Sequence, residues 1–162
     1  MIKAIVFDRD GVVTKNDKHY YVWNEEQLEY VDGIFENLKL LVQHGFELYM
    51  VSNQGGISKG LYTKPDVLQL NQAIFQELKK HEIEISEVLF CPHHSEIENC
   101  LCRKPKSILI EKLMAKHKLC KKNTFFIGDS DTDMQAAEKA GIQGIRISSN
   151  QNMKPFILSL LK

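Results

Sequence analysis

An excess of charge of either sign is missing from this sequence of 162 residues. Lysine plus arginine and aspartate plus glutamate number 21 each, so the formal net charge is zero. A chain without a basic excess produces no overall field that would attract nucleic acid or an anionic membrane. We therefore expect a small-molecule partner, with neither nucleic acid nor membrane as a partner.

A long hydrophobic run is missing from the N-terminus. The apolar stretch AIVF at 4–7 is followed at once by the charged residues of DRD. Such a stretch is shorter than the hydrophobic region of a signal peptide or a membrane span. Repeats and low-complexity tracts are missing as well, and the length suits one core. These features predict a cytoplasmic protein with a single domain over 1–162.

Cysteines are few, and three of the four lie together in CPHHSEIENCLC at 91–102. In a reducing compartment such cysteines are thiols or metal ligands more often than disulfides. Cys100 and Cys102 are also too close in sequence to bridge each other comfortably. Cys120 stands apart, and we expect it to pack in the interior.

Short apolar runs alternate with helical patterns along the chain, which predicts an α/β fold. The runs are nearly continuous in hydrophobicity, as in buried parallel strands. We expect a doubly wound, Rossmann-like parallel sheet with helices on both faces and no separate cap domain. Asp32, Pro65 and Pro105 mark helix starts, and Gly45 and Gly141 mark helix ends. The predicted strands are 2–7, 46–52, 87–91, 124–129 and 143–147, and the predicted helices are 33–44, 66–81, 106–119 and 131–140, followed by a loop and a short amphipathic segment within 148–162.

Chemically active side chains fall at the ends of the predicted strands. Asp8 and Asp10 follow the first strand, and Asp129 ends the fourth. Ser52 and Asn53 close the second strand. Because the carboxyl ends of parallel strands share one edge of the sheet, we expect these side chains to converge on one site.

The carboxylates of this set predict a magnesium site. Asp8, Asp10 and Asp129 would repel one another at that edge, and a hard cation between them relieves the repulsion. Oxygen ligands with an open coordination sphere suit Mg²⁺, which shares its site with substrate phosphate. The alternative is that Asp10 and Gly11 form a turn and that Asp129 and Asp131 cap a helix.

Other groups predicted at this edge suit a phosphoryl group. Ser52 and Asn53 can donate hydrogen bonds, and Lys104 adds a fixed positive charge. A cation and a lysine would neutralise the phosphoryl oxygens, which is most of what phosphoryl transfer needs. One carboxylate can attack phosphorus, and a second can protonate the leaving oxygen and then activate water. Asp8 and Asp10 fit these two catalytic roles.

Four segments of the chain carry recognisable motifs: FDRDGVV (7–13), VSNQGG (51–56), RKP (103–105) and GDSDTD (128–133). They resemble the motifs of the haloacid dehalogenase superfamily of phosphatases. The resemblance implies that Asp8 is the nucleophile and a magnesium ligand. It implies that Asp10 is the acid/base and also offers its backbone carbonyl to the metal, while Asp129 completes the protein ligands.

The same resemblance implies roles for the residues around the phosphate. Ser52 and Lys104 would hold the phosphoryl group. Asp133 matches the position that orients the lysine or a metal-bound water, whereas Asp131 has no assigned role. Arg103 either reaches the substrate or faces solvent.

The cysteine-rich loop predicts a structural zinc site. Cys91 and His93, with Cys100 and Cys102, offer four soft ligands, which suits tetrahedral Zn²⁺. Because protein fills every position, none is left for water, so this zinc would be structural and the magnesium catalytic. Metal binding would hold the two residues that follow the loop beside the phosphate. The alternative is a loop of cysteines without metal, and His94 is expected to face solvent.

This zinc loop resembles that of a narrower group of these phosphatases, which act on D-glycero-D-manno-heptose 1,7-bisphosphate or on histidinol phosphate. The segment SNQGGISKG (52–60) is closer to the heptose enzymes, whereas RKPKSILIEK (103–112) is closer to the histidinol enzymes. We expect a heptose bisphosphate 7-phosphatase, with histidinol phosphate as the alternative substrate. A phosphorylatable signalling module would use the same acidic pocket as a switch, but an acid/base at Asp10 favours turnover.

The predicted elements leave no room for a separate cap domain, so we expect an open site for a small phosphorylated metabolite. Specificity would then come from the zinc loop and from two short loops, 14–31 and 55–65. Tyr20, Tyr21 and Trp23 are expected to pack against the sheet edge. Zero net charge and the missing cap make a monomer the expected state.

Overall fold

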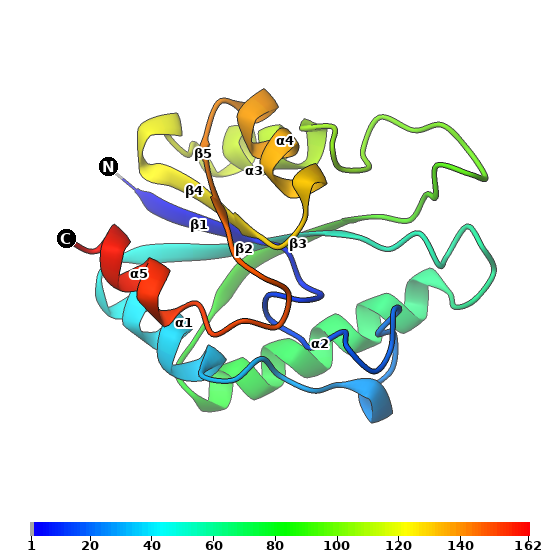
Figure 1. Cartoon of the computed structure of the whole chain (residues 1–162), viewed down its shortest axis with the longest axis horizontal. Helices are drawn as coiled ribbons and strands as arrows, with labels where there is room; N and C mark the ends of the chain where they lie inside the picture. The colour runs from blue at the N-terminus through cyan, green and yellow to red at the C-terminus, as the bar shows by residue number, and fades with distance from the viewer. Residues whose placement is uncertain (1) are drawn as a thin grey trace.

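The computed structural model describes residues 2–162 and contains a five-stranded parallel sheet with strand order β3-β2-β1-β4-β5 (Figure 1). Each predicted strand is present within two residues of its predicted bounds, which confirms the α/β fold. The strands are β1 (Lys3–Phe7), β2 (Phe46–Asn53), β3 (Ile85–Cys91), β4 (Thr124–Gly128) and β5 (Gln143–Arg146).

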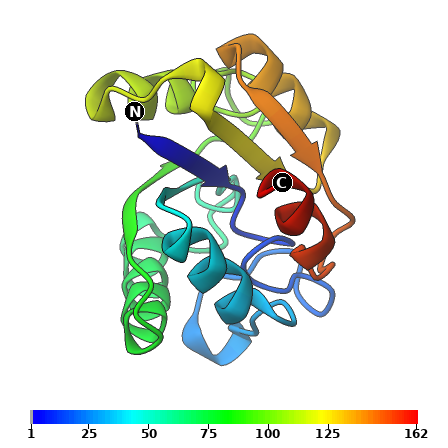
Figure 2. The same cartoon turned by 90° about the vertical axis from the view of Figure 1, so that its left-hand side faces the viewer.

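Helices cover both faces of the sheet, as predicted (Figure 2). Alternate residues of β1 point to opposite faces. Ile5 and Phe7 join the core under α1, α2 and α5, and Ala4 and Val6 join the core under α3 and α4. The helices are α1 (Ile34–Gln43), α2 (Lys64–Lys80), α3 (Ile108–His117), α4 (Asp131–Ala140) and α5 (Lys154–Leu160), with short 3₁₀ turns at Glu25–Gln27 and Lys121–Asn123.

The observed helix starts follow side-chain caps more closely than they follow the positions of the prolines. Thr63 accepts a hydrogen bond from the Asp66 backbone and donates to its carboxylate, so α2 begins before the predicted start. Helix α3 begins at Ile108 instead of directly after Pro105, because Pro105 lies in a turn in which the Lys106 N–H donates to the Arg103 carbonyl at 2.9 Å. Gly141, at φ +74°, ends α4 as predicted.

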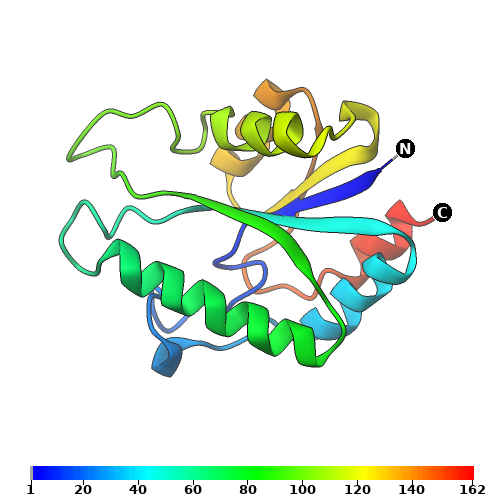
Figure 3. The same ribbon diagram turned by 180° about the vertical axis from the view of Figure 1, so that it is seen from behind.

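The carboxyl ends of the strands carry the long loops, and both termini lie at the opposite end of the sheet (Figures 1 and 3). β1 pairs with β2 on one side and with β4 on the other. The connections from β1 and β4 leave toward opposite faces, so the crevice of a doubly wound sheet lies here. Asp8 and Asp129 follow these two strands directly.

The segment after β5 is a loop followed by α5, as predicted. Ile157 of α5 is fully buried, and the helix packs against α1. Over the part of the chain that the structure describes, no helix combines the length and hydropathy of a membrane span.

Candidate active site and metal centres

Lys104 lies at the centre of a buried charge cluster. Its Nζ is 2.8 Å from Asp8 Oδ1 and 2.6 Å from Asp133 Oδ1. Asp133 is fully buried, and its Oδ2 accepts hydrogen bonds from the backbone N–H groups of Asp129 and Ser130 at 3.2 and 3.1 Å. Asp133 therefore joins the start of α4 to the lysine, in agreement with the orienting role that the resemblance implied.

Burial dominates the titration of these groups. It raises the pKa of Asp8 to about 7, against the charge of Lys104 and with an added contribution from Asp133. Burial also raises the pKa of Asp129. For Lys104, burial disfavours the charged form, but Asp8 and Asp133 outweigh it and leave the pKa raised. One lysine thus faces several carboxylates, and a bound cation would relieve the imbalance.

Four donors hold the Asp10 carboxylate. Oδ1 accepts from Arg9 Nε and from Thr14 Oγ1, each at 3.0 Å. Oδ2 accepts from Arg9 Nη2 at 3.1 Å and from Gln54 Nε2 at 2.8 Å. Two residues that follow one another in the chain make this bidentate ion pair because the backbone turns at once after β1. The Val13 and Thr14 N–H groups both donate to the Arg9 carbonyl.

The two polar residues at the end of β2 face different partners. Ser52 is 1% exposed, and its Oγ accepts a hydrogen bond from Gln54 Nε2 at 2.6 Å. Asn53 uses both ends of its side-chain amide on the Lys104 backbone, accepting from its N–H at 3.0 Å and donating to its carbonyl at 3.1 Å. Asn53 therefore fixes the lysine's position, and phosphate binding by either residue stays a prediction.

A cavity of about 250 Å³ opens above this network. It brings together the predicted catalytic, magnesium and phosphate-binding residues with the exception of Ser52, which lies beneath it. The remaining walls come from the loop after β1, from Gly55 in the loop after β2, and from the start of α4. The lining residues are Asp8, Asp10, Asn16, Tyr20, Tyr21, Asn53, Gly55, Arg103, Lys104, Asp129, Ser130, Thr132 and Asp133.

Tyr20 and Tyr21 line this cavity, so the prediction that they pack against the sheet edge is wrong. Tyr20 is 81% exposed and meets Tyr21 edge-on, with 4.8 Å between ring centroids. Trp23 stacks on Tyr62 with 6.0 Å between centroids and 10° between ring planes. This stacking packs the loop after β1 against the loop after β2. The packing places Tyr20 and Tyr21 over the ends of the strands.

The zinc loop brings Arg103 to the cavity wall, which favours the substrate-facing alternative. Arg103 Nη1 donates to the His93 carbonyl at 3.0 Å. The His94 side chain is only 12% exposed, so the prediction that it faces solvent is wrong. Its ring covers Gly55, where an added Cβ would come within 2.9 Å of it.

A hard divalent cation fits the carboxylate cluster. Asp8, Asp129 and Asp133 offer oxygens that all lie within 4.8 Å of one another, a donor set that suits Mg²⁺. Gly11, at φ +87°, permits this approach, because an added Cβ would lie 2.1 Å from Asp129 Oδ2. The Asp10 carboxylate is turned toward its four donors, so the backbone carbonyl is the group left for the metal contact that the resemblance implied.

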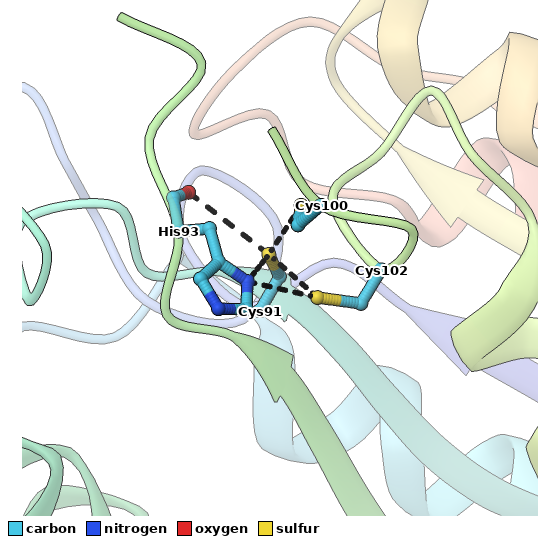
Figure 4. A group of neighbouring side chains, drawn as sticks. All are labelled: Cys91, His93, Cys100 and Cys102. Carbon is cyan, nitrogen blue, oxygen red and sulfur yellow. Dashed lines mark hydrogen bonds between the residues drawn. The ribbon is translucent and has the colours of Figure 1, made fainter. Parts of the chain in front are cut away.

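Cys91, His93, Cys100 and Cys102 converge as predicted (Figure 4). The Sγ of Cys91 lies 3.0 Å from that of Cys102 and 3.7 Å from that of Cys100. The four ligand atoms lie within 4.8 Å of one another, and three thiols with one imidazole fit tetrahedral Zn²⁺. Cys120 lies apart and is partly buried, and all four cysteines are free.

The sequence reasoning missed several polar residues of the site. Arg9 lies between the two aspartates that are predicted to be catalytic, and Gln54 directly follows Asn53, so motif spacing alone could have drawn attention to both. Ser149 and Asn16 carry no such signal. Ser149 Oγ donates to Asn16 Oδ1 at 2.9 Å, and its hydroxyl lowers the pKa of Asp129 against the larger effect of burial.

Comparisons with known proteins agree with this arrangement. A family profile described as HAD-hydrolase-like matches residues 101–155. The chain is 38% identical over 152 residues to the D-glycero-alpha-D-manno-heptose-1,7-bisphosphate 7-phosphatase of Campylobacter jejuni, an alignment covering 94% of this chain and 85% of that relative. It is 39% identical over 142 residues to the D-glycero-beta-D-manno-heptose-1,7-bisphosphate 7-phosphatase of Helicobacter pylori, covering 87% of this chain and 80% of that relative.

A solved structure shows the same fold. The D,D-heptose 1,7-bisphosphate phosphatase from B. bronchiseptica, crystallised with magnesium and phosphate, superposes with a TM-score of 0.85 at 23% identity. The match covers 98% of this chain and 87% of that one. With identity above 30% to relatives over most of both lengths, the chain belongs to the haloacid dehalogenase-like phosphatases, in the family of the D-glycero-D-manno-heptose-1,7-bisphosphate 7-phosphatases.

Proposed function

We propose that this protein removes the 7-phosphate of D-glycero-D-manno-heptose 1,7-bisphosphate through an aspartyl-phosphate on Asp8. One observation carries the proposal: Asp8 lies on the wall of a cavity, paired with Lys104, in a chain with two relatives of that activity at 38% and 39% identity. Family membership favours turnover over a phosphorylatable signalling module.

In the first step, Asp8 attacks phosphorus. Its Oδ1 already accepts from Lys104 Nζ and from the Arg9 backbone N–H, both at 2.8 Å, so Oδ2 is the oxygen that attacks. A bond forms between Oδ2 and phosphorus, and the bond from phosphorus to the sugar oxygen breaks. Asp10 enters this step in its protonated form, which the second step restores, and gives that proton to the departing oxygen. Lys104 offsets the charge that develops on the phosphoryl group.

In the second step, Asp10 takes a proton from water as that water attacks phosphorus. The bond from phosphorus to Asp8 breaks, which releases inorganic phosphate and restores the carboxylate. Ser52, Asn53 and Arg103 remain the proposed phosphate and substrate contacts, and Asn53 in addition holds the Lys104 backbone.

Two metals complete the proposal. Asp8, Asp129 and the backbone carbonyl of Asp10 would hold Mg²⁺, which when bound neutralises phosphoryl oxygens. Asp133 would orient Lys104. Structural Zn²⁺ would be held by Cys91, His93, Cys100 and Cys102. Relatives named for both the alpha and the beta anomer align with this chain, so the anomer is left open.

A substrate panel tests the proposal. With Mg²⁺ present, kcat/KM is measured for heptose 1,7-bisphosphate, histidinol phosphate and simple sugar phosphates. We expect the highest value for the heptose bisphosphate, with a product that retains its 1-phosphate by phosphorus NMR. A higher value for histidinol phosphate would establish the alternative substrate. Cytoplasmic location, a monomeric state and a single domain stay predictions from the sequence.

A further inference from the structure

We propose that Arg9 is a positioning residue that holds the Asp10 carboxylate in the orientation needed for proton transfer. Thr14 and Gln54 complete the set of donors. This inference rests on the proposed function, because it takes Asp10 as the acid/base. It adds a role for a side chain that does not line the substrate cavity.

Arg9 is anchored as firmly as the carboxylate that it holds. The side chain is 0% exposed, whereas that of Asp10 is 18% exposed and borders the cavity. Besides its two bonds to Asp10, the guanidinium donates from Nη1 to Asn71 Oδ1 at 3.1 Å and from Nη2 to the Val22 carbonyl at 2.6 Å. Helix α2 and the loop after β1 therefore fix the guanidinium from the side opposite Asp10.

Gln54 holds the Oδ2 atom of the Asp10 carboxylate. Its Oε1 accepts from the Tyr62 hydroxyl at 2.9 Å, which turns the amide nitrogen toward Asp10 and Ser52. Tyr62 is 5% exposed and stacks on Trp23, so the substrate-facing loops and the acid/base share one anchor. Thr14 Oγ1 adds the fourth donor.

The geometry suits positioning better than it suits stability. A buried ion pair contributes little net stability, because the cost of removing two charges from water offsets their attraction. Each oxygen of Asp10 accepts two hydrogen bonds, so the plane of the carboxylate is fixed, and the residue lines the cavity. Proton transfer depends steeply on such alignment, and a misplacement of about 1 Å can cost about 100-fold in rate.

Leaving-group dependence separates positioning from a general structural role. The sugar alkoxide of heptose 1,7-bisphosphate needs a proton as it leaves, whereas the phenolate of p-nitrophenyl phosphate does not. The rate of phosphoenzyme formation is measured for both esters by rapid quench with wild-type protein, Arg9→Met and Thr14→Val. We expect Arg9→Met to slow the sugar ester about 100-fold and the aryl ester less than about tenfold.

Thr14→Val keeps the Arg9–Asp10 ion pair and removes one of the four hydrogen-bond donors to the Asp10 carboxylate. It therefore provides the test if Arg9→Met does not fold. We expect it to slow the sugar ester about tenfold, with a smaller change for the aryl ester. In an Asp10→Asn background neither replacement should slow phosphoenzyme formation further, because the group being positioned is gone. Circular dichroism and thermal unfolding confirm that each variant is folded.

Equal losses on the two esters, or full additivity with Asp10→Asn, would overturn the proposal. The substrate assignment can fail separately. If the wild-type protein does not hydrolyse heptose 1,7-bisphosphate, the proposed substrate is wrong, and the same comparison is made with an alkyl phosphate that it does hydrolyse. If Asp10→Asn itself affects both esters equally, the acid/base assignment fails, and this proposal fails with it.

Discussion

Two clusters of candidate metal ligands lie at the same end of the sheet, but they are built in opposite ways. The cysteine and histidine cluster comes from one continuous stretch, residues 91–102. The carboxylate cluster joins the end of β1, the end of β4 and the first turn of α4. The first is a product of local spacing, and the second exists only because β1 and β4 are neighbours in the sheet. We therefore expect damage to the zinc loop to reduce stability first and damage to the carboxylate cluster to reduce catalysis first.

The sharpest test of the carboxylate side is Asp8→Asn. Asparagine has nearly the same shape and keeps an oxygen that can accept from Lys104 and from the Arg9 backbone N–H, so the fold should hold. Without a carboxylate no aspartyl-phosphate forms, and we expect steady-state phosphate release to fall on the order of 10⁴-fold. Thermal unfolding should change little. A variant that keeps a tenth of the wild-type rate would remove Asp8 as the nucleophile.

Removal of zinc tests the other cluster. Purified protein should contain about one equivalent of zinc by elemental analysis. If zinc is present at about 1,000 times its Kd, stripping it with a chelator should cost about 4 kcal/mol, or a fall in Tm of about 10 °C. Activity should fall as a consequence, because Arg103 and Lys104 directly follow the last ligand, and should return with added Zn²⁺.

Cys120→Ser is the matched control for this experiment, since Cys120 lies outside the cluster. We expect it to keep both the zinc content and the Tm shift on chelation. A metal-free preparation with full activity and an unchanged Tm would show that the loop needs no metal, and the contrast between the clusters would be lost.

Two acidic residues of α4 provide an internal comparison. Asp133 is fully buried against Lys104, whereas the Asp131 side chain is 90% exposed and pairs with Arg146 at the surface. Asp133→Asn should cost about 3 kcal/mol by leaving the lysine partly uncompensated, measured by urea unfolding, and should also lower the rate. Asp131→Asn should change neither quantity. Equal changes in unfolding free energy and rate for the two variants would mean that the buried ion pair contributes no more than the surface pair.

Gly11→Ala tests the close approach between the turn after β1 and the carboxylate cluster. Gly11 and Gly45 both have positive φ, at +87° and +79°, so alanine at either position should cost about 1 kcal/mol in backbone strain. An added Cβ meets Asp129 at Gly11 but nothing within 4 Å at Gly45. We therefore expect Gly11→Ala to lower kcat about tenfold through displacement of Asp129, and Gly45→Ala to leave kcat unchanged.

The contrast also explains which sequence predictions succeeded. Buried strands need continuous apolar residues, so their positions could be read directly, whereas the start of α2 depended on the capping pair of Thr63 and Asp66. The zinc ligands lie close in sequence, and their convergence was predicted without any fold. The acidic residues could be grouped only after parallel strands had been assumed, because that topology brings strand ends together.

What the sequence determined by itself was the α/β alternation, the close spacing of the cysteine and histidine cluster, and the resemblance that places Asp8 and Asp10 in a phosphatase motif. Only the tertiary structure decided that the Asp10 carboxylate turns toward Arg9, Thr14 and Gln54, that Tyr20 lines the cavity, and that Ser149 lies beside Asp129 of the carboxylate cluster. The physical reason is that a hydrogen bond or a cavity wall depends on where loops distant in sequence meet. Loop packing sets that meeting, and local periodicity does not encode it.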